Sequence, residues 1–347
     1  MNQTGVVVLN SSSKKLGVSM PRDGHGRIID YLRISVMDRC NLRCTYCMPL
    51  EGLKFLPEES LLSAEEIGLV VQAATASGFR KFRITGGEPT LRKDLIDIIQ
   101  RMRAAAPEAD IAMTTNGILL PSMAEELKSA GLNRVNIHLD TLDGDRLRQV
   151  MRLSDLDRIM SGIEAAKQAG LTPIKINSVV VRGVNDEDVI DLAKKTLTEP
   201  WQVRFIELMP FGSGEPEEIA QQKGVPSSES KIRIEKALGP LTSLQAKDPS
   251  DESRNFKLEN AEGSVGFISP VSDPFCAFCN RVRLSAEGRL LLCLLRDDEA
   301  DLRGVIRNGG GVSEIKKALA AAILTKPVGH ALDQGIHASR RMHEIGG

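Results

Sequence analysis

The chain has 347 residues, of which 41% are hydrophobic and 26% charged, with a formal net charge of −1. This length can bury a large core, and one large α/β domain with an appendage is the default expectation over two modest domains. The near-zero net charge argues against binding a nucleic-acid polymer through bulk charge. No apolar run is long enough to cross a bilayer, so we expect no membrane association.

The N-terminal segment and the cysteines bear on the compartment. Residues 1–26 include Lys14 and Lys15 but lack the apolar core of a signal peptide, and they predict a mobile leader. Six cysteines without an export signal indicate a reducing cytoplasm, where clustered thiols are typical metal ligands rather than disulfides.

Strand-like and helix-like segments alternate from residue 31 onward. A capping-box pattern, Ser63-Ala64-Glu65-Glu66, opens the first helix, which is expected to end near Ser77. The pattern predicts strands at 31–36, 80–85, 110–115, 134–140, 173–181 and 201–209, with further helices near 94–106, 155–169 and 186–197. Gly86-Gly87-Glu88-Pro89 and Asn116-Gly117 provide the turns after the second and third strands.

Six short strands separated by crossovers predict parallel pairing and a partial (βα)6 TIM-type barrel. A doubly wound open sheet is the alternative. The barrel is favoured because the strands carry polar residues that a dry sheet core would reject, which indicates an occupied lumen. These residues are Arg83, Asn136, His138, Lys175 and Asn177. Asn116 and Asn177 are candidates to face the lumen but are not part of the predicted site.

The pattern changes after Met209. A Gly/Pro/Glu-rich linker at 212–228 and a helix at 229–238 precede short alternating segments that predict an antiparallel extension. We therefore divide the chain into a leader (1–26), a barrel (27–211) and a C-terminal region (212–347). Surface or loop roles are expected for Asp143, Glu207 and the acidic stretch 215–218.

Three cysteines, Cys40, Cys44 and Cys47, lie within CNLRCTYC. A structural zinc site needs four protein ligands and a disulfide framework needs an even number of cysteines, so three thiols satisfy neither. Three thiolates can hold three irons of a [4Fe-4S] cube and leave the fourth iron open to a small molecule. A zinc knuckle remains the alternative.

This first motif resembles the signature of the radical S-adenosylmethionine (SAM) superfamily. The Cx3Cx2C spacing follows the first strand, Tyr46 precedes the third cysteine, and the GGEP turn ends the second strand. The resemblance implies that the open iron chelates SAM and that the reduced cluster releases a 5'-deoxyadenosyl radical. The turn glycines are expected to let the backbone approach the SAM amino group.

A second triplet, Cys276, Cys279 and Cys293, lies in the C-terminal region. A second [4Fe-4S] cluster with its own open iron fits this number of thiols. The alternatives are a zinc ribbon that lacks one ligand, or a redox pair with an unrelated third cysteine.

The wider set of motifs is similar to the GTP 3',8-cyclase family of molybdenum cofactor biosynthesis. It comprises CNLRCTYCMP, RITGGEPTLRKDL, TTNG, RVNIHLDTLD, RFIELMP, FCAFCNRVRLSAEGRLLLCL and the terminal Gly-Gly, in that order. The resemblance implies conversion of GTP into (8S)-3',8-cyclo-7,8-dihydroguanosine 5'-triphosphate with two [4Fe-4S] clusters and SAM. It also implies a cytoplasmic homodimer, an electron donor such as flavodoxin or ferredoxin, and a downstream cyclic pyranopterin monophosphate synthase.

The same resemblance assigns the site residue by residue. The cysteines of both triplets hold the clusters; Cys40, Cys44 and Cys47 act in catalysis together with Gly346 and Gly347. SAM contacts fall on Tyr46, Gly87, His138 and Met209. GTP contacts fall on Arg33, Arg83, Thr114, Lys175, Arg281, Val282 and Arg283. His138 departs from the family, which often has serine there. Arginine suits phosphate oxygens because its forked donors match them.

Two further functions remain open from the sequence. The chain could be another radical SAM enzyme with an auxiliary cluster, such as a peptide-modifying one, although more auxiliary cysteines would then be expected. It could also be a two-cluster electron carrier or a zinc-binding scaffold.

Overall fold

The structure is a computed structural model that describes residues 20–212, 215–246 and 248–346. Its centre is one curved sheet in which the first six strands lie side by side in chain order and run parallel. They are β1 (Tyr31–Ser35), β2 (Lys81–Thr85), β3 (Asp110–Thr115), β4 (Arg134–His138), β5 (Lys175–Val180) and β6 (Gln202–Glu207). The prediction of a partial parallel barrel is confirmed.

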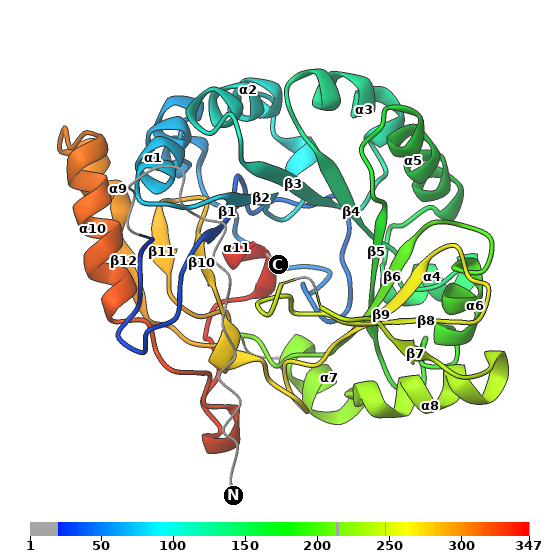
Figure 1. The fold of residues 1–347 in the computed structure, drawn as a ribbon. Helices are drawn as coiled ribbons and strands as arrows, with labels where there is room; N and C mark the ends of the chain where they lie inside the picture. Colours follow the sequence, from blue (N-terminus) through cyan, green and yellow to red (C-terminus); the bar gives the residue numbers. More distant parts are fainter. Residues whose placement is uncertain (1–19, 213–214, 247, 347) are drawn as a thin grey trace, which may run out of the picture.

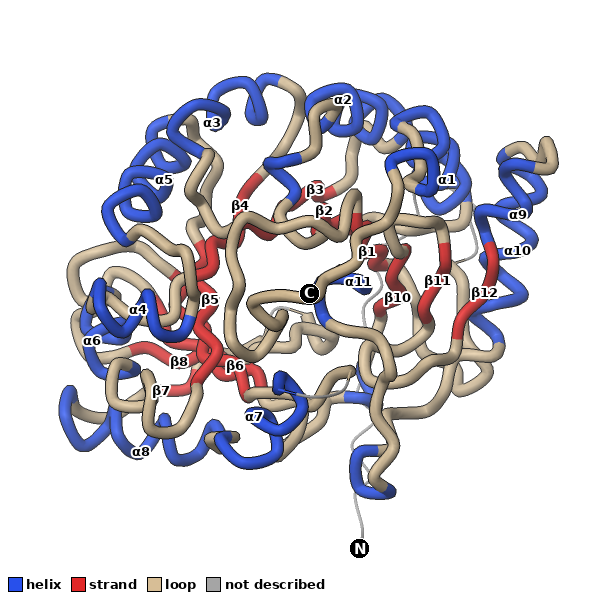
Figure 2. The backbone as a smooth tube through the Cα atoms, turned by 180° about the vertical axis from the view of Figure 1, so that it is seen from behind, coloured by secondary structure: helices blue, strands red, loops and turns tan. Residues whose placement is uncertain are grey.

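Helices cover the convex outer side of this sheet (Figures 1 and 2). The crossover helices are α1 (Ala64–Ala76), α2 (Leu95–Ala105), α3 (Leu120–Ser129), α4 (Gly144–Val150), α5 (Leu156–Gln168), α6 (Val189–Lys195) and α8 (Ser227–Leu238). The predicted capping box opens α1, since the Ser63 hydroxyl accepts from the Glu66 N–H while the Glu66 carboxylate accepts from the Ser63 N–H. Apolar faces of strands and helices form one continuous core between the two layers.

The C-terminal strands extend the sheet at both of its ends. At one end β9 (Ser264–Ile268) joins β6 in parallel, followed by antiparallel β8 (Arg254–Lys257) and β7 (Thr242–Ser243). At the other end β10 (Arg281–Leu284) joins β1 in parallel, followed by antiparallel β11 (Arg289–Leu291) and β12 (Glu299–Asp301). The predicted antiparallel extension is therefore present, but it is divided between the two edges of the barrel sheet.

Further helices complete the C-terminal region, and one of them corrects the predicted linker. The segment 212–228 contains α7 (Glu215–Lys223) and the first turn of α8. The others are α9 (Leu302–Arg307), α10 (Val312–Leu324), α11 (Met342–Ile345) and the short 3-10 helices η1 (Glu58–Ser60), η2 (Pro89–Leu91), η3 (Cys276–Phe278) and η4 (Leu332–Gln334). None of the described helices is both long and apolar enough to span a membrane.

The structure describes the last part of the predicted leader. Residues 1–19 lie outside the described part, but residues 21–26 are folded against the protein. Arg22 forms a β-bridge with Ile28, and the buried Asp23 carboxylate accepts backbone N–H groups of His25 and Arg27. The Arg27 guanidinium pairs with Asp23 at 2.6 Å, so this turn is held in place.

Candidate active site

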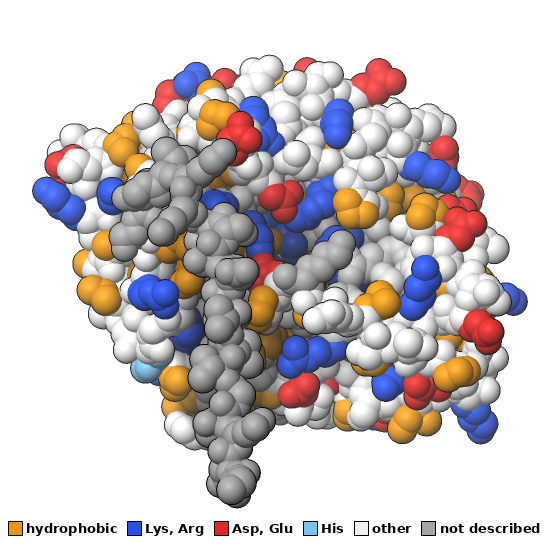
Figure 3. Space-filling view, viewed as in Figure 1, with side chains coloured by type: hydrophobic (Ala, Val, Ile, Leu, Met, Phe, Trp, Pro, Cys, Tyr) orange, Lys and Arg blue, Asp and Glu red, His pale blue; other side chains and the backbone are white. Residues whose placement is uncertain are grey.

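The carboxyl ends of the parallel strands open into one large cavity. Its empty volume, including space open to solvent, is about 1870 Å³. Both cysteine triplets, four strand arginines and the segment around Met342 line it. On the face shown in Figure 3, Lys and Arg side chains gather in the central hollow of the molecule. The cavity therefore joins metal ligands and cationic side chains in a single space.

The first cysteine triplet occupies the loop after β1. Burial and the Glu88 carboxylate raise the pKa of the Cys40 thiol to about 12, and burial together with Cys40 raises the pKa of Cys47 to about 12. Burial also raises the pKa of Cys44 well above its usual value. Such thiols need a bound cation to become thiolates, which is what an iron cluster provides.

The GGEP turn holds this loop against the ends of β2 and β3. A Cβ atom at Gly87 would lie 2.3 Å from the Arg39 carbonyl oxygen, and one at Gly86 would lie 2.5 Å from the Met37 carbonyl oxygen. The turn glycines are therefore required because the cysteine loop packs directly on them. Gly87 also lines the cavity, and its contact with SAM stays a prediction.

Glu88 ties the same turn to the third strand. Its fully buried carboxylate accepts from the Thr115 hydroxyl at 2.7 Å and from the Asn116 N–H at 2.7 Å. The Asn116 side-chain amide in turn donates to the Asn41 side chain in the cysteine loop at 2.7 Å. The ends of β2 and β3 and the cysteine loop are thereby fixed to one another.

Tyr46 and His138 meet at a buried aspartate. The Tyr46 hydroxyl donates to Asp140 Oδ2 at 2.6 Å and lies 2.5 Å from His138 Nε2, which is itself 3.1 Å from Asp140 Oδ2. Burial opposes protonation of the imidazole, but the neighbouring Asp140 carboxylate outweighs it and raises the pKa of His138. The larger side chain at position 138 is accommodated by this network, and it lines the cavity.

The second cysteine triplet faces the cavity from the C-terminal region. Cys276 begins η3, Cys279 directly follows it, and Cys293 follows β11. Burial raises the pKa of Cys293, and the nearby Cys279 and Cys276 thiols add to the rise. Arg27 Nη1 donates to the carbonyl oxygens of Cys276 and Val328 at 2.7 Å each, which anchors η3 to the segment before β1.

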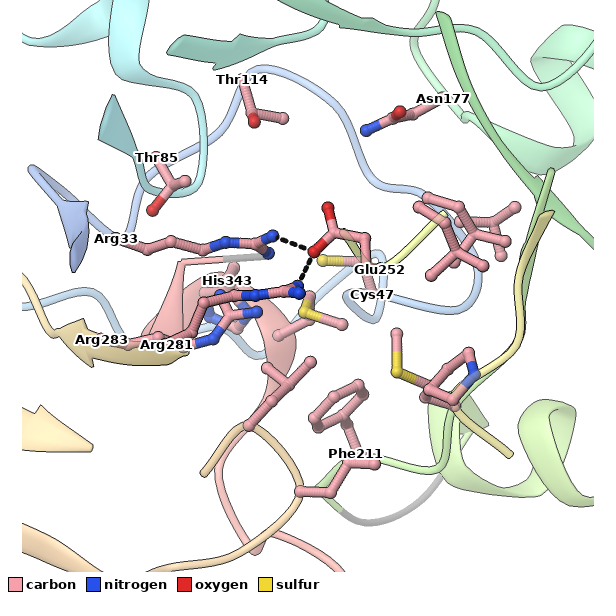
Figure 4. A pocket seen from close by; sticks show the side chains of 18 of the residues that line it. Arg33, Cys47, Thr85, Thr114, Asn177, Phe211, Glu252, Arg281, Arg283 and His343 are labelled. Atoms are coloured by element: carbon pink, nitrogen blue, oxygen red, sulfur yellow. Dashed lines mark hydrogen bonds and ion pairs between the residues drawn. The ribbon is translucent and has the colours of Figure 1, made fainter. Parts of the chain in front are cut away.

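Arginines from three adjacent strands form the wall between the triplets. Arg33 on β1 is in register with Arg83 on β2 and with Arg283 on β10, so all three point to the same side of the sheet. All three line the cavity and are buried. Arg281, two residues before Arg283, also lines it, and Figure 4 shows Arg33, Arg281 and Arg283 extending into the same space.

This wall carries a concentrated positive charge. Burial and repulsion from other cations lower the pKa of Arg83 to about 10, and those of Arg281 and Arg283 fall well below their usual value for the same reasons. Burial alone would raise the pKa of the Tyr31 phenol, but Arg83, Arg33 and Arg281 lower it to about 8. Buried cations at this density are costly without an anionic partner.

One strand arginine and one asparagine of this cluster were not predicted as site residues. Arg204 on β6 is 1% exposed, and burial and Arg83 lower its pKa to about 9. With its amide turned to suit its neighbours, the buried Asn136 accepts from Arg204 at 3.1 Å and from Arg83 at 3.0 Å. The signal for Arg204 was present, since it is a charged residue at an inward position of an apolar strand.

The C-terminal segment closes the cavity from the other side. The Arg283 guanidinium donates to the Gly346 carbonyl oxygen, and Gly346 is buried at φ +72°. A Cβ atom there would lie 2.3 Å from Thr85 Oγ1. His343 lines the cavity, and its backbone lies within hydrogen-bonding reach of the Cys47 sulfur.

The structure brings most of the predicted site residues to this cavity. Those that line it are Arg33, Cys40, Cys44, Tyr46, Cys47, Arg83, Gly87, Thr114, His138, Met209, Cys276, Cys279, Arg281, Val282, Arg283 and Cys293, together with Asn116 and Asn177, which had been left out. Lys175 is not among the residues that line it, and burial and the nearby Arg204 lower the pKa of Lys175 to about 7. Gly347 lies outside the described residues.

The surface or loop role predicted for Glu207 is wrong. The residue is 4% exposed, and its carboxylate accepts from the backbone N–H groups of Ser227, Val271 and Ser272. It therefore fixes the start of α8 and the loop after β9 to the end of β6. Asp143 fits its predicted loop role, since it caps α4.

The three thiols of each triplet match the number that an iron cube with one open iron takes. In the described part of the chain, no three His, Cys, Asp or Glu side chains converge closely enough to share one metal ion. The thiols of each triplet nevertheless influence one another electrostatically. An iron cube takes its ligands from separate irons, so it accepts more widely spaced thiolates than the tetrahedron around one zinc ion.

Comparison with known families agrees with this geometry. Residues 34–196 match the Radical SAM superfamily, and residues 201–332 match the family described as Molybdenum Cofactor Synthesis C. The fold resembles the crystal structure of Streptococcus suis SuiB bound to S-adenosylmethionine, with a TM-score of 0.60 at 15% identity over 88% of this chain and 74% of that one.

Similarity to curated proteins extends over nearly the whole chain. The GTP 3',8-cyclase of Pelotomaculum thermopropionicum is 45% identical over 94% of this chain and 100% of its own length. The GTP 3',8-cyclase of Moorella thermoacetica is 43% identical over the same shares. The chain therefore belongs to the radical SAM superfamily and, within it, to the GTP 3',8-cyclase family of molybdenum cofactor biosynthesis.

Proposed function

We propose that the chain binds GTP between its two cysteine triplets and converts it into (8S)-3',8-cyclo-7,8-dihydroguanosine 5'-triphosphate. The observation that carries this proposal is the arginine wall, which lies in the same cavity as both triplets. A nucleoside triphosphate is the kind of ligand that presents several anionic oxygens to such a wall. Its base and ribose would then extend toward the cysteines.

Different residues of the wall would contact different parts of GTP. Arg33, Arg83 and Arg283 are positioned by strand register, so their spacing does not depend on a flexible loop. Arg281 and Val282 follow directly after Cys279 and Asn280, and they therefore link phosphate binding to the second cluster. Thr114 offers a hydroxyl from the third strand, and Lys175 adds positive charge near Arg204.

The SAM side of the cavity is built around the first triplet. Bound SAM and a reduced first cluster would supply the radical that starts the reaction. Tyr46 and His138 are held by Asp140, so they can orient a ribose or carboxylate group, while Gly87 and Met209 border the same space. The C-terminal segment reduces access of water and places Gly346 beside Arg283.

Several partners follow from this chemistry as part of the proposal. Residues 27–211 would provide the first cluster and residues 212–347 the second, in a cytoplasmic homodimer. A one-electron donor such as flavodoxin or ferredoxin would reduce the first cluster. A cyclic pyranopterin monophosphate synthase would consume the product.

GTP-dependent cleavage of SAM tests the proposal directly. Anaerobically reconstituted protein should cleave SAM and consume GTP in equal amounts once a reductant is supplied, and ATP should not replace GTP. SAM cleavage that requires a peptide instead would favour another radical SAM enzyme. Electron transfer without SAM cleavage would favour an electron carrier.

A further inference from the structure

One carboxylate occupies the centre of the arginine wall. Glu252 lies in the segment between β7 and β8, and its side chain is 10% exposed. Its Oε2 pairs with Arg33 Nη2 at 2.6 Å and also with Arg281 Nη1, and its Oε1 lies 3.8 Å from Arg83 Nη1 and 3.9 Å from Arg204 Nη1. Figure 4 shows Glu252 between Arg33 and Arg281 inside the cavity. A single carboxylate thus contacts four arginines from four strands.

The chain on either side of Glu252 holds it in this position. The Ser250 carbonyl oxygen accepts from Arg281 Nη2 at 2.8 Å, and Asp248 pairs with Lys81 at the start of β2. Asp251 lies near Lys175 and Arg204 and partly offsets the mutual repulsion of these cations. Acidic and polar groups of residues 248–252 therefore face cations of the lumen at several points.

The arginines of the wall carry more positive charge than Glu252 neutralises. Among the residues that the structure describes, Glu252 is the one carboxylate ion-paired with Arg33, Arg83, Arg204 or Arg281. The Nε atoms of Arg33, Arg83 and Arg204 are buried and have no hydrogen-bond partner. One negative charge cannot balance four guanidinium groups, so a ligand with several anionic oxygens would satisfy the wall better than Glu252 does.

We infer that Glu252 is a built-in substitute for a substrate phosphate, and that the polyphosphate of the substrate displaces it when it binds. This inference rests on the proposed function, since it assigns an occupant to the phosphate end of the same cavity. In the free protein, the carboxylate offsets the repulsion between the arginines. A polyphosphate must take over Arg33 and Arg281, and it would repel a carboxylate left between them. Glu252 thereby excludes weakly charged anions from the wall.

Inorganic tripolyphosphate is the probe for this inference, because it carries the anionic oxygens of the substrate without its base. Its dissociation constant is measured by calorimetry on the anaerobically reconstituted full chain, with wild type, Glu252→Gln and Glu262→Gln compared. Glu262 is an exposed acid in the loop between β8 and β9 and has no part in the wall. It therefore controls for the loss of one negative charge. Removing the competing carboxylate should lower the dissociation constant at least tenfold in Glu252→Gln and leave it within about twofold in Glu262→Gln.

The result that overturns the inference is a dissociation constant that is unchanged or raised in Glu252→Gln. A raised value would mean that Glu252 orients the arginines for the anion and stays in place. Glu252→Gln could also lose affinity for tripolyphosphate only when Mg²⁺ is present. Glu252 would then be a ligand for the metal that accompanies the phosphates, and this result also overturns the inference. GTP-dependent SAM cleavage is measured separately, so a failure of the proposed function is distinguished from a failure of this inference.

Hydrogen exchange of the wild-type chain tests the same step without any variant. On saturation with tripolyphosphate, the backbone amides of residues 248–253 should exchange faster, because their segment loses its contacts with the wall. Slower exchange there would contradict displacement, since it would show that the segment closes over the anion.

Discussion

Replacing Gly346 with alanine should release the C-terminal segment from the cavity. Gly346 has a φ of +72°, and its added Cβ atom would lie 2.3 Å from Thr85 Oγ1 and 2.9 Å from the Ser35 Cβ atom. Gly335 has the same φ of +72°, but a Cβ atom there would meet nothing within 4 Å. Gly335→Ala is therefore a control with the same positive φ and no steric conflict.

The free-energy cost of backbone strain can be separated from that of the steric conflict. Left-handed backbone costs a non-glycine residue roughly 1–2 kcal/mol, and both variants incur it. Forcing a methyl group into a packed site adds about 1–3 kcal/mol in Gly346→Ala alone. The docked segment is held by a hydrogen bond from Arg283, of about 1.5–3 kcal/mol, and by burial of Ile345, of about 1.5–3 kcal/mol. The steric conflict and strain together are comparable to this docking energy.

Hydrogen exchange of residues 342–346 measures the effect, together with GTP turnover. Gly346→Ala should exchange rapidly in this segment and lose most turnover. Gly335→Ala should retain slow exchange in the same segment. Equal protection of residues 342–346 in both variants would show that the segment is not held at Thr85 and Ser35, and would refute the reasoning.

Three other predictions address the clusters and the wall. Cys276→Ser should reduce the iron content of anaerobic protein from about eight to about four per chain while the first cluster remains; an unchanged iron content would contradict the second site. Arg281→Ala should weaken GTP binding roughly tenfold to a hundredfold and spare SAM binding, because only the phosphates lose a charged donor; equal loss of both in equilibrium binding would count against its assignment. The pKa of Lys175 lies at about 7 in the free protein, and a bound anion should raise it. GTP affinity should thus be fully present below pH 7 and decline as pH rises through the pKa that Lys175 has in the GTP complex. When GTP affinity is measured against pH, this decline should be absent in Lys175→Met.

Much of the site was predictable because its residue types are chemically specific. Cysteine triplets limit the possible sets of metal ligands. Alternate residues of a strand face the same side of a sheet, so polar residues at inward positions, such as Arg83 and His138, indicate a lumen that holds a ligand. Arg204 obeyed the same rule within an apolar strand and could have been found by it. Lys175 also obeyed it, yet it lies at the start of β5 and is not among the residues that line the cavity.

The remaining features depend on tertiary contacts that local sequence does not encode. Glu252 lies in an acidic, serine-containing loop, a composition typical of solvated surface, and only the pairing of β8 with β9 brings it to the arginines. Glu207 is buried because backbone N–H groups from two distant segments converge on it. The sequence of the C-terminal strands has the alternating pattern of a single meander. Each edge of the barrel sheet, however, offers unpaired backbone groups, and β10 pairs with one edge while β9 pairs with the other.

The central claim is that each cysteine triplet leaves one iron open to a small molecule within the same cavity. Mössbauer spectroscopy of anaerobic protein enriched in iron-57 tests it most directly, with spectra recorded alone, with SAM and with GTP. The account predicts two [4Fe-4S] clusters, each with one distinct iron, of which one changes on addition of SAM and the other on addition of GTP. Zinc in place of iron, or clusters whose irons are all equivalent and insensitive to both molecules, would contradict it.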